Sequence, residues 1–338
     1  MAFSVEEVSM KSKITHTLKI SFVIVVLVFL GQKGFISLEA TQRAFQNTSS
    51  IAIAYCAFLS TTFLAMYRWN LLLKAQKIHL SLHKVFQLTL IGMFFNIALP
   101  GAVSGDIVKA IYVGKEAPGK RAYAFSSILF DRVAGVSALI LISAFSLIFG
   151  SKSDLGDELF NTLQWLVGGL GAGVILFFLY WLAVKKEKDP AYLLLKKIEI
   201  KNKVFHSIFR TYDGLRAYQQ ERKTVFISLA ISALIHICVI IGFKFLTQAL
   251  GLELPWMGLF AVVPLGLLFT AIPILPAGVG TGHAAFIALF QLLGSERGAD
   301  TFNLFVLTNI ALGLIGGLVY LRFKSSGIAL NAEEMEIN

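Results

Sequence analysis

Long uncharged apolar runs are the feature that most constrains the fold of this chain. A helix needs roughly 20 apolar residues to cross the hydrocarbon core of a bilayer, and most of the runs reach that length. They cover residues 20–32, 44–67, 85–105, 133–151, 159–184, 224–243, 254–295 and 301–321. Since 56% of the residues are hydrophobic and only 15% are charged, a water-soluble fold is excluded. The sequence predicts an all-α, polytopic integral membrane protein.

The first run, 20–32, is shorter than a crossing, and we extend it over Lys19, whose stem lets its ammonium reach the interface. Its basic start and apolar middle are also typical of a secretion signal. Because no convincing A-x-A cleavage site follows, we expect an uncleaved first span. The pattern predicts a single transmembrane domain over 1–338, with about six spanning helices and two broken segments.

Basic residues set the expected orientation. The segment 185–223 carries eleven lysines or arginines, and the positive-inside rule places it in the cytoplasm. Counting spans from there puts both termini and the loops 68–84 and 115–121 on the same side. We therefore expect a protein of the cytoplasmic (inner) membrane with both termini cytoplasmic. Within the basic segment, 201–219 has apolar residues at helical spacing, which predicts an amphipathic helix on the membrane surface.

The net charge of +10 is accounted for by these inner loops and their attraction to anionic lipids. Basic residues patterned on a soluble module are missing from the sequence, so we expect no nucleic-acid partner. No His, Cys, Asp or Glu cluster has the spacing of a metal site, and "GVGTG" lacks the βαβ context of a dinucleotide loop. We expect no metal and no cofactor. The sequence leaves the oligomeric state open.

Two stretches interrupt the apolar runs with proline and glycine. The segment 85–113 is flanked by cytoplasmic loops, so it must enter the membrane and return through the break "ALPGAVSG". The run 254–295 is too long for one crossing and doubles back, from the outer side, at "ILPAGVGTG". The breaks contain Pro100, Gly101, Gly105, Pro276, Gly278, Gly280 and Gly282.

The two breaks share Leu-Pro, two small residues and Val in register, and they lie in segments of opposite sense. This suggests an inverted repeat, in which broken helices meet near the midplane and form a substrate site. The alternative is chance, since small apolar motifs recur in membrane proteins.

Ionisable residues follow the first break. Asp106 and Lys109 share one helix face, and Asp131 and Arg132 lie inside the next span. Each charge at the centre of a span costs about 2.5 to 3.5 kcal/mol, so a function or a close partner must compensate. For Asp106, Lys109 and Arg132 we favour a polar cavity over purely structural ion pairs. Asp131 either neutralises Arg132 or pairs with Lys109.

Three further polar residues lie in apolar runs or beside them. His283 directly follows the second break and is a candidate site residue, with a packing role as the alternative. His236 is interpreted as a satisfied interior histidine. Lys244 lies near the outer end of its span, where we expect it to reach the interface.

Four motifs in this order carry a family resemblance: "YRWNLLLKAQ" (67–76), "LPGAVSGDIVKA" (99–110), "FDRVAG" (130–135) and "PAGVGTGHAAF" (276–286). Through them nearly the whole chain resembles the transmembrane region of the lysylphosphatidylglycerol synthetase and flippase family, the multiple peptide resistance factor. The resemblance implies two re-entrant breaks around a lipid-accessible cavity and a role in moving phospholipids or lipid-linked molecules between leaflets.

The resemblance also assigns residues. Gly105 and Asp106 stand where the family has Gly-Glu, Lys109 where it often has arginine, and Arg132 where it has arginine. The last motif departs from the family pattern, because Gly282 and His283 occupy the two positions where the family has an Arg-Glu pair. His283 is therefore a candidate proton-sensitive replacement. Only a short tail follows Lys324, so we expect no lysyl transfer from tRNA.

Three functions follow as hypotheses. The first is a flippase-like transporter in which Lys109 and Arg132 hold an anionic phospholipid headgroup and Asp106 and Asp131 neutralise them or contact a cationic group. The second is an intramembrane enzyme on a lipid headgroup, with His283 and Asp106 as base and acid. The third is a small-solute or ion transporter on the same fold. A recognisable catalytic motif is missing, so we expect that the protein is not an enzyme.

Overall fold

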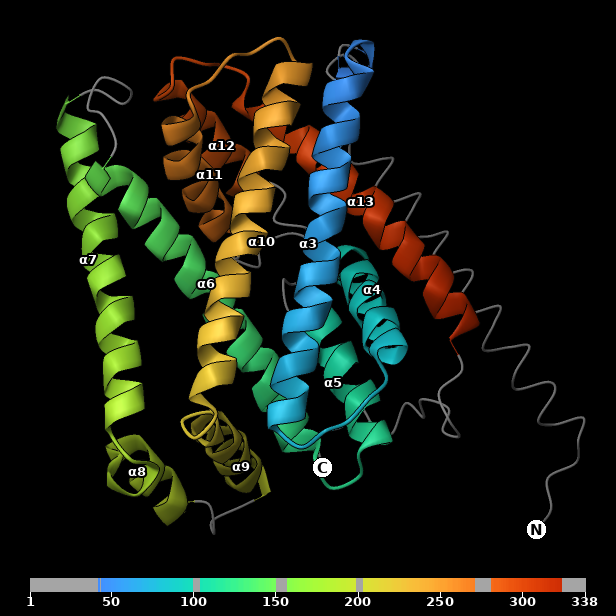
Figure 1. Ribbon diagram of the computed structural model, residues 1–338, viewed down its shortest axis with the longest axis vertical. Coiled ribbons are helices and arrows are strands. Elements are labelled where there is room, and N and C mark those ends of the chain that lie inside the picture. Colours follow the sequence, from blue (N-terminus) through green and yellow to red (C-terminus); the bar gives the residue numbers. More distant parts are fainter. Residues whose placement is uncertain are drawn as a thin grey trace, which may run out of the picture.

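The computed structural model describes residues 42, 44–99, 104–149, 157–198, 203–270 and 281–323. Its regular elements are helical (Figure 1). They are α3 (Thr48–Ala75), α4 (Leu82–Ala98), α5 (Ser104–Glu116), α6 (Arg121–Phe149), α7 (Asp157–Ala183), η2 (Lys186–Lys188), α8 (Pro190–Ile198), α9 (Lys203–Ala217), α10 (Arg222–Ala249), α11 (Trp256–Thr270), α12 (Thr281–Gln291) and α13 (Gly298–Arg322). The predicted first span, and the breaks at Pro100, Gly101, Pro276, Gly278 and Gly280, lie outside the described residues.

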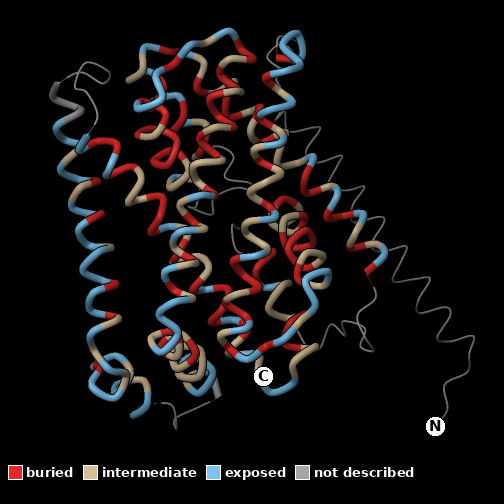
Figure 2. Tube along the Cα trace, viewed as in Figure 1, coloured by how far each residue is buried: buried red, intermediate tan, exposed pale blue. Residues whose placement is uncertain are grey.

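Five of the described helices are long and apolar enough to cross a membrane: α3, α6, α7, α10 and α13. The outermost, α7, packs against α6, and much of its length is exposed (Figure 2). Its exposed residues include large apolar ones such as Trp165 and Leu176. Such a surface requires a lipid environment. The predicted class, an all-α polytopic membrane protein, is confirmed.

Four shorter helices form two hairpins. The helices α4 and α5 contain 17 and 13 residues, and α11 and α12 contain 15 and 11, so each is too short for a comfortable crossing. Within each hairpin the two helices pack against one another. The hairpins enter from opposite ends of the bundle, as the charge pattern predicted (Figure 1).

The helix contacts repeat between the two halves of the chain. The helices α3 and α10 pack along one another and run in opposite directions (Figure 1). The helix α4 packs against α13 as α11 packs against α6, and α5 packs against α6 as α12 packs against α13. The sequences Ser-Gly-Asp (104–106) and Thr-Gly-His (281–283) begin the second helices of the two hairpins. This correspondence favours the inverted repeat over chance.

Glycines let the hairpin helices approach closely. A Cβ atom on Gly105 would lie 1.9 Å from the carbonyl oxygen of Gly92, so only glycine fits where α5 crosses α4. The Gly105 N–H donates a hydrogen bond of 2.9 Å to the Asn96 Oδ1 atom, which satisfies a donor at the start of α5. In the second hairpin Gly282 lies against the Phe302 ring. Gly105 is therefore a packing position between the two helices of its hairpin, and Gly282 is one between α12 and α13.

The helices α8 and α9 lie across one end of the bundle, where α3 and α5 also end (Figure 1). Arg216 of α9 is buried and donates hydrogen bonds to the carbonyl oxygens of Trp181 and Val184, at the end of α7. The predicted amphipathic helix within 201–219 is confirmed as α9. Its contact with a membrane surface stays a prediction.

Candidate functional site

The carboxylate of Asp106 lies at the centre of the candidate site. It is buried in the first turn of α5, where the helix dipole favours an anion. The Lys109 Nζ atom lies 2.9 Å from its Oδ1 atom, and the Arg132 Nε atom of α6 lies 2.5 Å from its Oδ2 atom. The structure thus brings together the three residues that the sequence placed in one polar cluster. Two cations share one carboxylate, so these three side chains together carry one net positive charge.

The path of the Lys109 side chain depends on a neighbouring glycine. A Cβ atom on Gly92 would lie 2.9 Å from the Lys109 Cδ atom, so a larger residue would block the lysine stem. The Lys109 Nζ atom also lies 4.7 Å from the centre of the Trp69 ring, a cation–π contact from α3. Three helices of the first half therefore position this ammonium beside Asp106.

The two cations differ in accessibility. The Arg132 side chain is 39% exposed, whereas the side chains of Lys109 and Asp106 are 12% and 6% exposed. Arg132 is thus the member of the cluster that an incoming group can reach. Its planar guanidinium suits an oxyanion such as phosphate.

Asp131 lies in a different cluster from the one we predicted. Its carboxylate accepts hydrogen bonds from Arg68 of α3, with 2.7 Å from Nε to Oδ1 and 3.0 Å from Nη2 to Oδ2. The predicted pairing with Arg132 or Lys109 is therefore wrong. Adjacent helix positions point about 100° apart, so Asp131 faces α3 while Arg132 faces α5.

Sequence reasoning missed Arg68, which was assigned to a cytoplasmic loop. It lies inside α3, is buried, and donates a further hydrogen bond of 2.6 Å to the Ser232 Oγ atom of α10. The signal was present in the sequence, since the apolar character of 44–67 resumes directly after Arg68 with "WNLLL". A charge flanked by apolar residues on both sides predicts an interior position better than a loop.

The other polar residues have separate partners. The His283 Nε2 atom lies 2.7 Å from the Asn303 Oδ1 atom of α13, and its ring meets Phe302 edge-on. The His236 Nε2 atom lies 3.0 Å from the Gly135 carbonyl oxygen, but its buried Nδ1 atom has no hydrogen-bond partner among the described residues, so this interior histidine is only half satisfied. Lys244 donates to the Glu253 carboxylate at 3.0 Å, near the end of α10. Within the described residues, Asp106 has Lys109 and Arg132 as its charged partners, and His283 is held by another helix.

The fold is a helical bundle with two short hairpins of opposite sense, and one hairpin carries the buried carboxylate. These features define a polytopic membrane protein of inverted-repeat architecture. Residues 17–325 match the family model described as the lysylphosphatidylglycerol synthase TM region, and the chain belongs to this family. The resemblance seen in the sequence motifs is confirmed.

Curated relatives are similar over most of their length. A UPF0104 membrane protein of Pyrococcus horikoshii is 23% identical over 308 residues, which cover 85% of this chain and 89% of the relative. A UPF0104 membrane protein of Methanothermobacter thermautotrophicus is 24% identical over 273 residues, with 75% and 79% covered. One from Methanocaldococcus jannaschii is 26% identical over 202 residues, with 59% and 80% covered. No solved structure matches the chain significantly.

Proposed function

We propose that this protein is a flippase-like transporter that moves a phospholipid or a lipid-linked molecule with an anionic headgroup between leaflets. The observation that carries the proposal is the cluster in which Lys109 and the half-exposed Arg132 share the buried Asp106 carboxylate. The cluster lies at the start of the second helix of a re-entrant hairpin, a position that binds anionic substrates in inverted-repeat transporters.

The physical requirement is replacement of water. A headgroup that crosses hydrocarbon loses its hydration, and an ion without compensating partners is too costly to bury. A phosphate diester carries one negative charge, which is equal and opposite to the sum of the charges of Asp106, Lys109 and Arg132. In the proposed step, the Arg132 guanidinium turns from Asp106 to the phosphate while Lys109 continues to neutralise the carboxylate.

Exchange of fluorescent phosphatidylglycerol between leaflets of proteoliposomes tests the proposal. We expect Arg132→Ala and Lys109→Ala to lose most of the exchange, and the matched control Lys186→Ala to keep it. Lys186 also pairs with an aspartate, Asp213 at 3.0 Å, but it lies outside the spans. Correct insertion is verified by protease access to the 185–223 segment. Full exchange in both site variants would refute the assignment of the site.

The same vesicles separate this function from its rivals. We propose that the headgroup leaves chemically unchanged, so mass spectrometry of the lipids before and after exchange should show identical masses. A covalently altered headgroup would instead support an intramembrane enzyme. Flux of an encapsulated anionic solute without lipid exchange would support a solute transporter.

A further inference from the structure

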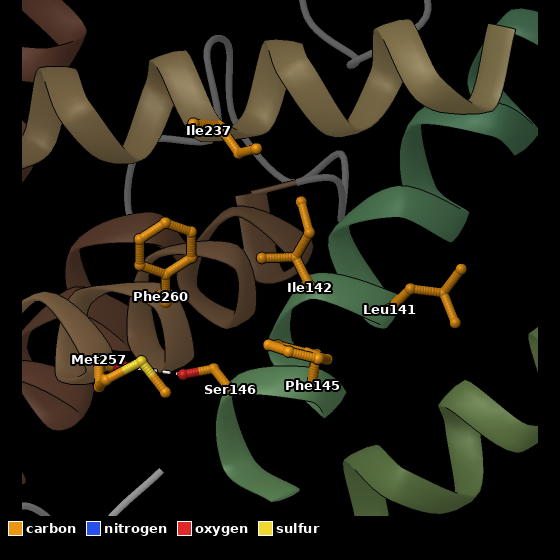
Figure 3. Close-up of a pocket in the computed structure, with 7 residues that line it drawn as sticks. All are labelled: Leu141, Ile142, Phe145, Ser146, Ile237, Met257 and Phe260. Carbon is orange, nitrogen blue, oxygen red and sulfur yellow. Dashed lines mark hydrogen bonds between the residues drawn. The ribbon is translucent and has the colours of Figure 1, made fainter. Parts of the chain in front are cut away.

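An apolar groove lies between α6, α10 and α11, away from the charged cluster. It encloses about 390 Å³, within the range of roughly 300 to 1,000 Å³ that ligand pockets occupy. Figure 3 shows side chains from all three helices around it. They are Leu141, Ile142, Phe145, Ser146, Ile237, Met257 and Phe260.

The polar groups at the groove are already satisfied. The Ser146 hydroxyl donates a hydrogen bond of 2.8 Å to the Met257 carbonyl oxygen, which joins α6 to α11 (Figure 3). One turn earlier, Ser143 donates at 3.1 Å to the Ala261 carbonyl oxygen. The wall therefore presents carbon and sulfur to its occupant. A charged headgroup would lose its hydration there without compensation.

The groove opens towards the surroundings of two membrane-crossing helices. Both α6 and α10 are candidate spans, and Phe145 at the groove is 62% exposed. The exposed apolar face of a helix that crosses a bilayer is surrounded by lipid hydrocarbon. Hydrocarbon chains are thus the apolar molecules at highest concentration beside the opening.

The corresponding interface in the other half of the repeat is closely packed at glycines. There α13 packs on α4 through glycines, and a Cβ atom on Gly316 would lie 2.0 Å from the Leu90 carbonyl oxygen. At the α6–α11 interface the bulky Ile142 and Phe260 line the space instead. The two interfaces therefore differ in packing, and the large side chains at the groove disfavour the close approach through small residues that is common between membrane helices.

We infer that this groove binds one acyl chain of a membrane phospholipid. This inference rests on the proposed function and adds a detail to it. It names the place where the acyl chain is bound while the headgroup of the same lipid is bound by Asp106, Lys109 and Arg132. Binding of the chain is measurable separately from exchange, so failure of one is distinguishable from failure of the other.

The test uses phosphatidylglycerol with a diazirine in one acyl chain, in phosphatidylcholine vesicles that contain the full-length protein. After irradiation, mass spectrometry locates the crosslinked peptides. We expect enrichment in the peptides that contain Leu141 to Ser146 and Met257 to Phe260. Leu141→Trp and Ile237→Trp fill the groove from two different helices and should each remove that enrichment.

The matched control is Ile148→Trp, which adds the same bulk to an exposed α6 position outside the groove lining. This control should keep the crosslinks, and all variants are compared as monodisperse protein in size-exclusion chromatography. Crosslinks spread evenly over the exposed faces of α6 and α7 would overturn the inference. Unchanged crosslinks in both Leu141→Trp and Ile237→Trp would also overturn it. So would the finding that a second copy of the chain covers the groove and excludes the lipid.

Discussion

Arg68 of α3 and Asp131 of α6 form a largely buried bidentate ion pair, with nitrogen to oxygen distances of 2.7 and 3.0 Å. The next residue of α6, Arg132, reaches Asp106 of α5. Two neighbouring residues therefore connect α6 to α3 on one side and to the re-entrant hairpin on the other. Any sliding of α6 past α3 must break a buried pair of charges, whereas the half-exposed Arg132 can change partner at lower cost.

Removal of one member of the α3–α6 pair should destabilise the bundle. Asp131→Asn leaves the Arg68 charge buried without its counter-charge, and we expect a loss of about 3 to 5 kcal/mol in the free energy of unfolding. Thermal denaturation of the purified protein in detergent micelles measures this. The more exposed pair of Lys186 and Asp213 is the comparison, and Lys186→Ala should cost about 0 to 1 kcal/mol.

An apolar replacement of the whole pair separates charge from packing. Arg68→Met combined with Asp131→Leu removes both charges together, so most of the lost stability should return. If the double variant is as unstable as Asp131→Asn, the pair is not held by its electrostatics.

The members of the Asp106 cluster should differ in their effect on stability. Asp106→Asn leaves two cations together in a buried site, and we expect a loss of about 3 to 5 kcal/mol. Arg132→Gln should cost less, because its side chain is 39% exposed and solvent or lipid headgroups can reach the site. Denaturation midpoints of the two variants, measured side by side, check the order. The reverse order would show that Arg132 is a structural residue.

Hydrophobic length and loop charge were sufficient to predict the five spans and the two hairpins of the described residues, whereas the predicted first span lies outside them. The interior run 254–295 could not cross once, and the structure places α11 and α12 side by side within it. These features depend on local composition, which a sequence states directly. The turns themselves, with Pro100 and Pro276, lie outside the described residues, so their predicted role as breaks stays a prediction.

Partners across the bundle were less predictable. Asp106, Lys109 and Arg132 were grouped correctly because they lie beside one break, but Asp131 was assigned to the wrong cation. Its partner Arg68 is far away in the chain and comes close only through the packing of α3 on α6. The groove was also missed, since Leu141, Ile142 and Phe145 are the residue types of any lipid-facing helix. A gap between helices depends on their separation, which composition does not encode.

The attachment of α8 and α9 should weaken in acid. Burial would raise the pKa of Asp189, but hydrogen bonds from Tyr212 at 2.6 Å and the Ala191 N–H at 3.0 Å, with the Arg216 charge, outweigh it and hold the pKa below its ordinary value of 3.8. The stabilisation is therefore fully present above pH 3.8 and is lost as the pH falls through the lower, folded value.

Hydrogen–deuterium exchange of α8 and α9 peptides, corrected for intrinsic rates, measures this dependence. Protection should fall below pH 3.8 in the native protein. In Asp189→Asn the protection should be lower at neutral pH and nearly independent of pH. The α10 peptides act as an internal control. An unchanged pH profile in the variant would assign the transition to another group.

The contact between Gly105 and Gly92 should tolerate no side chain. Gly105→Ala places a Cβ atom 1.9 Å from the Gly92 carbonyl oxygen, so α5 must move away from α4, and we expect a loss of at least about 1 to 3 kcal/mol. The same movement shifts Asp106 relative to Arg132, so phospholipid exchange should fall as well. The matched control is Gly173→Ala on α7, where a Cβ atom meets nothing within 4 Å and alanine improves helix propensity by about 1 kcal/mol. Thermal denaturation and phospholipid exchange are measured for both variants. Equal stability of Gly105→Ala and Gly173→Ala would show that α4 and α5 can separate freely at this crossing.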